Sequence, residues 1–251
     1  MSFKPNEYFN NEYDPLDLSS IYNYSKKLVG KTLRDLCHDD ITKEDPDFLK
    51  EKDKKKRSGK NFGMYLEKYY FGYSNNSESE PDFLEAGVEL KSSGLKLKHK
   101  SYYTMYVKKE PRLTLSTINN AEIIYEEFET SSFYKKNKTL LIVFFDRDVN
   151  DKLEHNIDKE IIDTYLYRLT NYDFKIIKHD WEVIRNKVRN CQAHNLRNRD
   201  TEHLESCGGE SNAKEYSDYF NHDKYCPEPA KNKRFAYKKH FLDSIIDKAV
   251  N

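Results

Sequence analysis

The 251-residue sequence has no excess of charge, because 43 Lys and Arg residues are balanced by 43 Asp and Glu residues. No overall field therefore draws the chain to nucleic acid or anionic lipid, and such a partner must be met by a local patch. No stretch approaches the roughly 18 consecutive apolar residues of a membrane span, and the N-terminus lacks the basic and apolar regions of a signal peptide. These absences argue against a membrane protein and predict a cytoplasmic one.

Cysteine is also scarce, and the four cysteines are widely spaced without a C-x-x-C pair. This spacing argues against a dense disulfide framework and against a zinc ribbon, so we expect four ordinary thiols. A zinc site that uses Cys207, Cys226 and nearby histidines stays open as an alternative, although the gap between the two cysteines fits no standard ligand spacing. The histidines that could complete it are His194, His203 and His222.

Aromatic residues make up for the low apolar content of 37%, since 20 Tyr and 14 Phe supply large side chains for a core. The length suits one domain or two lobes that share a cleft. Residues 1–28 contain several of these aromatics. We leave open whether this N-terminal extension packs back as an arm, forms an interface or is disordered.

The strongest structural signal is the continuous apolar run at residues 139–145, which predicts a central strand buried on both faces. Apolar residues at helical spacing predict helices at 62–71, ended by Gly72, at 174–189 and around 241–246. Shorter patterns predict strands at 88–91, 101–107 and 122–128. The order of these elements indicates a mixed α/β protein.

Two basic stretches interleave lysines with aromatic residues, at 91–109 and 231–239, and the first contains no acid. Such a patch suits a phosphate backbone. In a chain that is 34% charged, a solvated face is an equally good interpretation.

Three residues carry the chemistry that we expect: Asp82, Glu89 and Lys91. Glu89 and Lys91 are two apart in a predicted strand and point to one face, while Val88 and Leu90 point to the other, toward the core. Mg²⁺ is commonly held by one or two carboxylates with waters and phosphate oxygens, so Asp82 and Glu89 are candidate ligands at a scissile phosphate. Lys91 would position the attacking water or help to deprotonate it, and would offset charge on the phosphate.

The E-x-K pattern is weak by itself in a chain so rich in Glu and Lys, and a salt-bridged surface strand is the alternative interpretation. Two observations favour a catalytic role. Glu89-Leu90-Lys91 is the only E-x-K in the sequence. It also lies between a predicted helix that carries another acid, Glu67, and the first basic stretch.

Longer motifs extend this pattern along the chain. They are Gly63-Met-Tyr-Leu-Glu67, Asp82-Phe-Leu-Glu-Ala-Gly-Val-Glu89-Leu-Lys91, Phe128-Glu-Thr-Ser-Ser-Phe133, Asp180-Trp181-Glu182, Ser211-Asn212-Ala213-Lys214 and Lys238-Lys239. In order and spacing they resemble the MutH family, which comprises a mismatch-repair nicking endonuclease and related type II restriction enzymes that act at GATC. The likeness covers roughly residues 29–248 and is greater to the restriction-enzyme branch.

This resemblance implies a mixed α/β fold of the restriction-endonuclease-like, PD-(D/E)XK type, with a mixed central sheet flanked by helices and two arms around a DNA cleft. We therefore expect a single endonuclease domain over residues 29–251. Within it, residues 29–150 would form the catalytic arm and residues 151–251 the DNA-recognition arm.

The resemblance also carries roles to individual residues. The catalytic pattern falls on Asp82, Glu89 and Lys91, with Glu67 as a further acid near the Mg²⁺ site and Lys136 as a supporting base. The candidates for DNA contact are Lys60, Lys138, Gly208, Gly209, Ser211, Asn212, Lys214, Lys238 and Lys239.

At the base-reading loop the sequence departs from the family, because an Arg-Pro-Lys triplet is replaced by Cys207-Gly208-Gly209. The replacement removes two cationic side chains that could address bases. Recognition of GATC and sensitivity to adenine methylation are therefore implied less firmly than cleavage.

The resemblance thus predicts a Mg²⁺-dependent type II restriction endonuclease acting on double-stranded DNA, with a cognate DNA methyltransferase as its companion. Some members carry a second, catalytically silent copy of the fold, and this chain has room for one. One copy on a palindromic site predicts a homodimer, or a monomer that nicks each strand in turn. A MutH-like nickase and a non-catalytic DNA-binding module remain as alternatives, although the intact acid-acid-lysine set counts against the module.

Overall fold

The computed structural model describes the chain as two compact units. The described residues are 4–44, 60–73, 80–100, 103–108, 112–147, 156–208, 216–217, 220–221, 224–226, 230–231 and 233–251. The first unit contains residues 1–110, 139–168 and 245–251, and the second contains residues 111–138 and 169–244. Each unit is thus assembled from segments that are distant in sequence. The predicted division into two arms around DNA stays a prediction.

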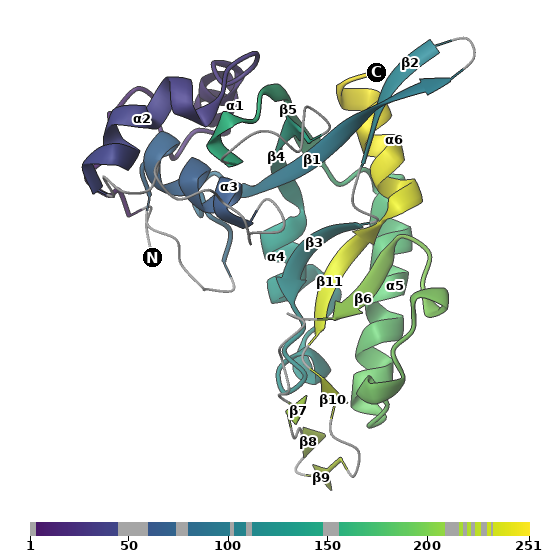
Figure 1. The fold of residues 1–251 in the computed structure, drawn as a ribbon. Coiled ribbons are helices and arrows are strands. Elements are labelled where there is room, and N and C mark those ends of the chain that lie inside the picture. The colour runs from purple at the N-terminus through teal and green to yellow at the C-terminus, as the bar shows by residue number, and fades with distance from the viewer. Residues whose placement is uncertain are drawn as a thin grey trace. The chain divides into compact units, whose positions relative to one another are not determined.

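The first unit is built on a four-stranded mixed sheet in the order β2-β1-β4-β5 (Figure 1). Its strands are β1 (Glu89–Lys100), β2 (Tyr103–Lys108), β4 (Thr139–Asp146) and β5 (Ile161–Arg168). β1 and β4 run parallel, whereas the pairs β1/β2 and β4/β5 are antiparallel. Residues 140–145 are all buried, so the apolar run does form an inner strand, as predicted.

Among the described residues, four helical segments precede the sheet in sequence. They are α1 (Leu18–Lys26), α2 (Leu33–Glu44), α3 (Lys60–Tyr65) and the π-helical turn η1 (Leu66–Tyr70). The predicted helix at 62–71 is therefore present, although its second half winds as a π-turn. It ends at Gly72, whose φ of +66° favours glycine.

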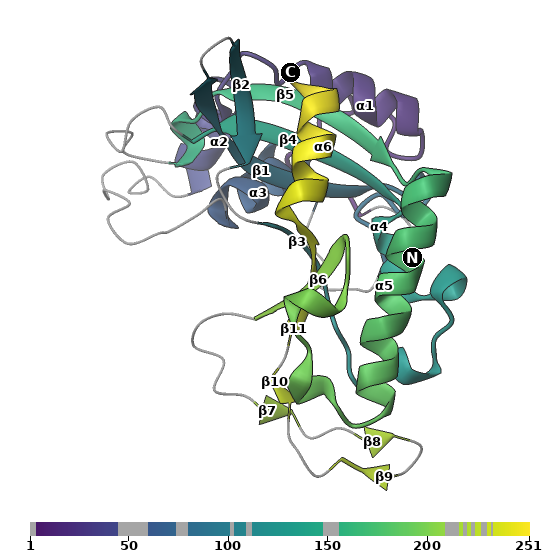
Figure 2. The ribbon, with the colours of Figure 1, turned by 90° about the vertical axis from the view of Figure 1, so that its right-hand side faces the viewer.

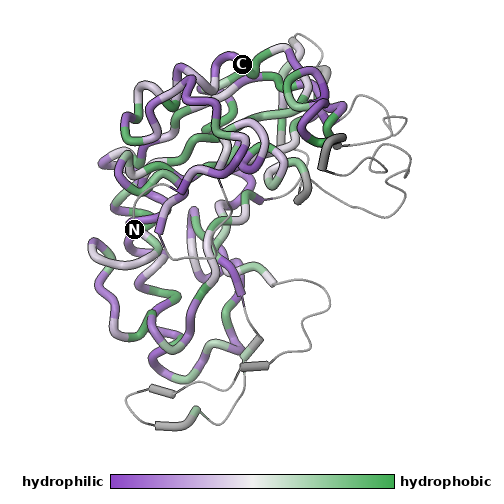
Figure 3. Tube along the Cα trace, turned by 90° about the vertical axis from the view of Figure 1, so that its left-hand side faces the viewer, coloured by the Kyte–Doolittle hydropathy of each residue, from purple (hydrophilic) through white to green (hydrophobic). Residues whose placement is uncertain are grey.

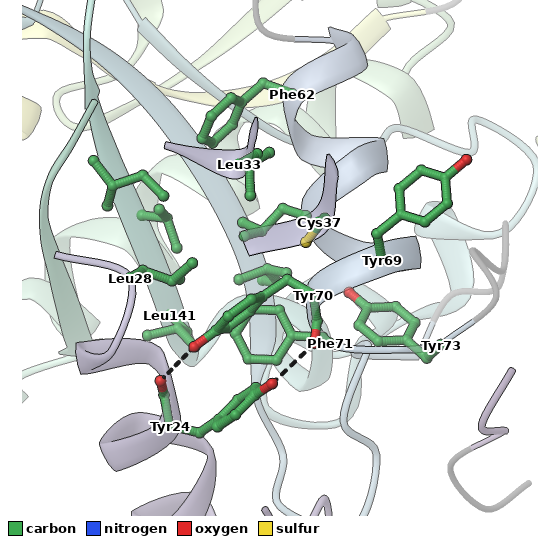
Figure 4. Close-up of a cluster of buried hydrophobic side chains, with 14 of the residues drawn as sticks. Tyr24, Leu28, Leu33, Cys37, Phe62, Tyr69, Tyr70, Phe71, Tyr73 and Leu141 are labelled. Carbon is green, nitrogen blue, oxygen red and sulfur yellow. Dashed lines mark hydrogen bonds between the residues drawn. The ribbon is translucent and has the colours of Figure 1, made fainter. Parts of the chain in front are cut away.

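The core of this unit is rich in aromatic side chains, several of which appear in Figure 4. Tyr24 and Tyr70 stack with their ring centroids 4.6 Å apart, and each hydroxyl donates a hydrogen bond to the other residue's carbonyl. Tyr13 is 6% exposed and stacks on Tyr24 at 4.7 Å. Three alternatives were left open for the N-terminal extension. The structure shows the first of them, because residues 4–28 pack back onto this core.

The second unit contains a three-stranded antiparallel sheet in the order β3-β11-β6. Its strands are β3 (Arg112–Thr117), β6 (Leu204–Gly208) and β11 (Lys233–Lys238). The helices α4 (Ser132–Asn137) and α5 (Asn171–Arg189) bury Phe133 and Trp181. In Figure 2, α5 runs along one side of these strands.

The prediction of a strand at 122–128 is wrong. Asn119 accepts hydrogen bonds from the N–H groups of Glu122 and Ile123 through its carbonyl and from that of Ala121 through its side chain. This arrangement starts a tight turn in place of a strand. The segment forms two 3₁₀ turns, η2 (Ile123–Tyr125) and η3 (Phe128–Thr130).

The remaining elements are short, apart from the C-terminal helix α6 (Lys239–Ala249), which was predicted. The side chain of Asn251 accepts a hydrogen bond from the N–H of Tyr106 at 2.7 Å and donates to its carbonyl at 2.9 Å. The short elements are η4 (Asn156–Asp158), η5 (Ala193–Asn195), η6 (Asn198–Asp200), β7 (Tyr216–Ser217), β8 (Phe220–Asn221), β9 (Lys224–Tyr225) and β10 (Ala230–Lys231).

The expectation of four free thiols is wrong for one pair, because Cys191 and Cys226 form a disulfide. Sequence spacing could not reveal it, since the fold brings together residues 35 apart in the chain. The pairing also removes Cys226 from the alternative zinc site. Cys37 and Cys207 are free and buried.

Hydrophobic stretches run through the inside of each unit, and hydrophilic segments lie along its outside (Figure 3). Among the helices of the described residues, none is long and apolar enough to cross a membrane.

Candidate active site

A tight hairpin brings Asp82 beside Glu89. Phe83 and Val88 form an isolated antiparallel bridge with N–H to O distances of 2.9 and 3.1 Å. Between them, Gly87 has a φ of +64°, which lets the chain reverse. The two acids flank this bridge and therefore lie opposite each other.

The alternation predicted for the start of β1 is observed. Val88 and Leu90 are buried in the apolar core of the first unit. Glu89 and Lys91 lie on the other face, and the Lys91 ammonium forms a short hydrogen bond and ion pair with Oε1 of Glu89. The side chain of Glu89 is 3% exposed and that of Lys91 is 19% exposed, so the pair is sheltered but reachable.

Backbone amides complete the geometry of the two acids. The N–H of Asp82 donates to Oε2 of Glu89 at 3.2 Å, and the N–H of Leu90 donates to Oδ2 of Asp82 at 2.8 Å. Each carboxylate is thereby held by the backbone beside the other acid. Asp82, Glu89 and Lys91 form one connected cluster.

Crowding of negative charge perturbs this cluster. Burial raises the pKa of the Asp82 carboxyl well above its usual range, and the nearby carboxylates of Glu89 and Glu67 raise it further against the opposing effect of Lys91. Burial alone would lower the pKa of the Lys91 ammonium, but Glu89, Asp82 and Glu67 together raise it. Lys91 therefore stays protonated, and Asp82 is ionised only at a cost.

Glu67 is brought to the same cluster from η1, as its effect on the pKa values of Asp82 and Lys91 indicates. Its Oε2 atom is buried. Because η1 is a π-turn, a feature often found at functional sites, the local geometry differs from that of a regular helix.

Two carboxylates on a sheltered face are a plausible donor set for Mg²⁺, which usually keeps several waters and takes one or two carboxylates. Among the described residues, no three Asp, Glu, His or Cys side chains form a ready cage for a metal ion. Burial first, and the neighbouring carboxylates second, raise the pKa of Asp82, and a bound cation would favour its ionised form against both. The residues present therefore fit a divalent cation such as Mg²⁺, which Asp82 and Glu89 would hold.

Several sequence-predicted residues belong to the second unit. Lys136 lies in α4, and Lys138 is an exposed residue just after it. Gly208 ends β6 and is exposed. Lys60 begins α3 in the first unit, but its side chain lies outside the described residues, as do Gly209, Ser211, Asn212 and Lys214 altogether.

Lys238 and Lys239, predicted to contact DNA, have intramolecular partners. The Lys238 ammonium donates to the carbonyls of Asn198, at 2.6 Å, and Thr201. Lys239 forms an ion pair with Asp243 at 2.6 Å on the exposed side of α6. Of the two, Lys239 is the more accessible.

Sequence reasoning missed Tyr73, which the fold places near the acids. Tyr73 is 3% exposed, and burial raises the pKa of its hydroxyl, with Asp82, Glu67 and Glu89 adding to the rise. Its position two residues after the predicted helix was the available signal, although nothing in the pattern marks it as close to Asp82.

A second missed feature lies on the sheet of the second unit. Nε of Arg112 pairs with the buried carboxylate of Glu205 at 2.9 Å. Arg112 is also the direct partner of Lys238 across the β3/β11 pair. A guanidinium thus lies beside a lysine that sequence reasoning assigned to DNA.

Comparison with known proteins agrees with these observations. Residues 71–180 match the family described as DNA mismatch repair enzyme MutH. Over 236 residues, 94% of this chain, the sequence is 31% identical to the type II restriction enzyme Sau3AI of Staphylococcus aureus, and the matched part is 43% of that enzyme. The chain therefore spans less than half the length of this relative. The resemblance to the MutH family is therefore confirmed, with the family match over residues 71–180.

Proposed function

We propose that this protein is a type II restriction endonuclease that hydrolyses phosphodiester bonds in double-stranded DNA at GATC, with Mg²⁺ as its cofactor and a restriction-endonuclease-like fold. The observation that carries the proposal is the connected cluster of Asp82, Glu89 and Lys91 at the start of an inner strand. The relationship to Sau3AI, a type II restriction enzyme, supports the same reaction class.

In this proposal Asp82 and Glu89 hold the metal ion. When bound, Mg²⁺ polarises the scissile phosphate and lowers the pKa of a coordinated water. Lys91 enters the reaction as an ammonium, because the surrounding acids raise its pKa, so its first role is to orient water and offset charge on the phosphate. Glu67 and Lys136 assist as a further acid and a supporting base.

DNA contacts come from residues outside the cluster. We assign backbone and base contacts to the family-matched positions, which are Lys60, Lys138, Gly208, Gly209, Ser211, Asn212, Lys214, Lys238 and Lys239. Residues 29–150 act as a catalytic arm and residues 151–251 as a DNA-recognition arm, and two protomers act together on a palindromic site. A cognate methyltransferase protects host DNA.

The test is digestion of unmethylated and adenine-methylated plasmid by the purified protein in Mg²⁺, with sequencing of the fragment ends. Discrete ends at GATC are expected. Asp82→Asn should abolish them, whereas Glu85→Gln, which changes an exposed acid in the same hairpin, should cut as wild type does. Retained DNA binding without cleavage by the wild type, in Mg²⁺ or Mn²⁺, would contradict the proposal and favour the non-catalytic module.

A strand-nicking repair endonuclease is the second candidate, because residues 71–180 match the MutH mismatch-repair family. Strand output separates the two candidates. Rapid formation of linear product from supercoiled plasmid is expected of the restriction enzyme. Relaxed circles that persist, and that need an added repair protein to form quickly, would favour the nickase.

A further inference from the structure

The N-terminal segment, residues 4–28, binds the end of the helix that carries Glu67. The last carbonyls of a helix have no partner within it and must be satisfied from outside. Here the chain leaves η1 through Phe71 and Gly72, both buried. One of these carbonyls, that of Glu67, has a local partner, because it accepts a hydrogen bond from the N–H of Tyr73 at 3.2 Å.

Four other carbonyls at this end accept hydrogen bonds from the N-terminal segment. The pairs are Asn6 Nδ2 to Lys68 O at 2.9 Å, Asn6 N to Gly72 O at 2.8 Å, Tyr13 Oη to Phe71 O at 2.6 Å and Tyr24 Oη to Tyr70 O at 3.3 Å. Partners from 46 to more than 60 residues away in sequence therefore complete one helix end.

The fit between the two segments is close. A Cβ at Gly72 would lie 2.5 Å from the Cα of Phe9, so only glycine allows the N-terminal backbone to approach there. Pro5 forms an isolated bridge with Tyr73. Burial raises the pKa of the Tyr13 hydroxyl, so that the group stays a neutral donor.

The helix end leads directly to the candidate active site. Glu67 belongs to η1, and its charge acts on Asp82, Lys91 and Tyr73. A π-turn departs from regular helical hydrogen bonding, so we expect the position of the Glu67 side chain to depend on what binds the end of η1. The N-terminal segment supplies that support from one side, and the hairpin at residues 83–88 holds Asp82 from the other.

We propose that Asn6, Tyr13 and Tyr24 are positioning residues for Glu67, and that through it they set the affinity of the acid cluster for a divalent cation. The inference rests on the proposed function only for its activity measurement. Residues that hold metal-site groups from behind commonly change metal affinity when they are altered.

The test compares a double variant with a single-substitution control, both within residues 4–28 of the full-length protein. Tyr13→Phe with Asn6→Ala removes the two side-chain hydrogen bonds to Phe71 and Lys68 and keeps the stacked ring of residue 13. Ser25→Ala is the matched control, because the buried Ser25 hydroxyl donates to Thr164 on β5, at 3.0 Å, and has no part at η1. The melting temperatures of both variants are measured, so that their losses of stability can be compared.

Three readouts are measured for each variant: Mn²⁺ affinity by calorimetry without DNA, amide exchange at Tyr73, and the Mg²⁺ concentration for half-maximal cleavage. The double variant should bind Mn²⁺ about tenfold more weakly, exchange faster at Tyr73 and need more Mg²⁺, and high Mg²⁺ should restore most of its activity. Ser25→Ala should change none of the three beyond about twofold.

Unchanged Mn²⁺ affinity and Tyr73 exchange in the double variant would overturn the inference, as would equal changes in Ser25→Ala, which would indicate a general loss of stability. If the wild type cuts no DNA, the proposed function fails. The first two readouts would still decide the positioning role.

Discussion

Asp180 and Asp82, one in each unit, show two different uses of a carboxylate. Asp180, on α5, is fully buried and accepts three backbone hydrogen bonds, from the N–H groups of Glu202, His203 and Leu204, at 2.7, 2.6 and 2.8 Å. Three converging donors replace the water that the carboxylate loses. Asp180 therefore ties the start of β6 to the helix.

Asp82 has a different environment. It accepts one backbone hydrogen bond, from Leu90, and lies near the carboxylates of Glu89 and Glu67. Its pKa is raised, mainly by burial, so the folded protein disfavours the ionised form of this carboxyl group. The comparison teaches that burial does not identify a functional acid. A functional acid is identified by negative charge that its surroundings leave uncompensated.

The largest expected effect is on cleavage by Asp82→Asn, which removes a proposed metal ligand. Activity should fall about a thousandfold or more, measured as the initial rate of plasmid cleavage, while DNA binding in Ca²⁺ is retained. Asp180→Asn should keep near wild-type activity per folded molecule. Equal losses of activity in both variants would remove the distinction between the two aspartates.

Stability should respond in the opposite order. Asp180→Asn leaves an amide group facing backbone donors and should lower the free energy of unfolding by about 2–4 kcal/mol. Urea denaturation measures this change. An unchanged free energy of unfolding in Asp180→Asn would mean that Asp180 does not anchor β6.

Asp82→Asn should stabilise the protein at neutral pH by about 1 kcal/mol. Because the folded pKa of Asp82 is raised, the wild type is penalised once pH rises through that pKa, and the penalty is absent below the unfolded value of about 4. The advantage of the variant should therefore grow with pH and vanish in acid, in urea titrations at several pH values. An advantage that does not depend on pH would contradict a charge-based cause.

The smallest expected effect concerns His203, whose N–H is bound by Asp180 and whose ring is 8% exposed. Burial lowers the pKa of its imidazole, and His240 lowers it further, against the opposing charges of Glu202, Asp180 and Asp173. The stability that neutral His203 contributes is complete above about pH 6.5 and is lost as pH falls, by up to about 1 kcal/mol. His203→Phe should flatten this acid limb in urea titrations, and an unchanged limb would exclude His203 as its source.

Local patterns predicted the elements that carry most of the first unit. The run at 139–145 became the inner strand β4, because a strand with neighbours on both sides buries both faces and needs no alternation. The spacing of Glu89 and Lys91 placed them on one face, because side chains two residues apart in a strand point the same way. Neither inference required knowledge of what lies across the sheet.

Predictions failed where a local signal competed with turns or distant partners. Ile123, Ile124 and Phe128 are buried, yet the turn that begins at Asn119 gives this segment 3₁₀ geometry. The Cys191–Cys226 disulfide depends on a separation that closes only in the folded chain. Residue alternation and cysteine spacing along the sequence give no information about either the turn or the disulfide.

The sequence by itself determined the face shared by Glu89 and Lys91, the inner strand and the family, because each depends on periodicity or on an ordered set of motifs. Only the tertiary structure decided that Asp82 lies against Glu89, that Glu67 and Tyr73 join them, and that residues 4–28 hold the end of η1. Apart from the contact within the residue 82–89 hairpin, these contacts join separate segments of the chain. Their energies come from burial and charge, which exist only once the core has formed.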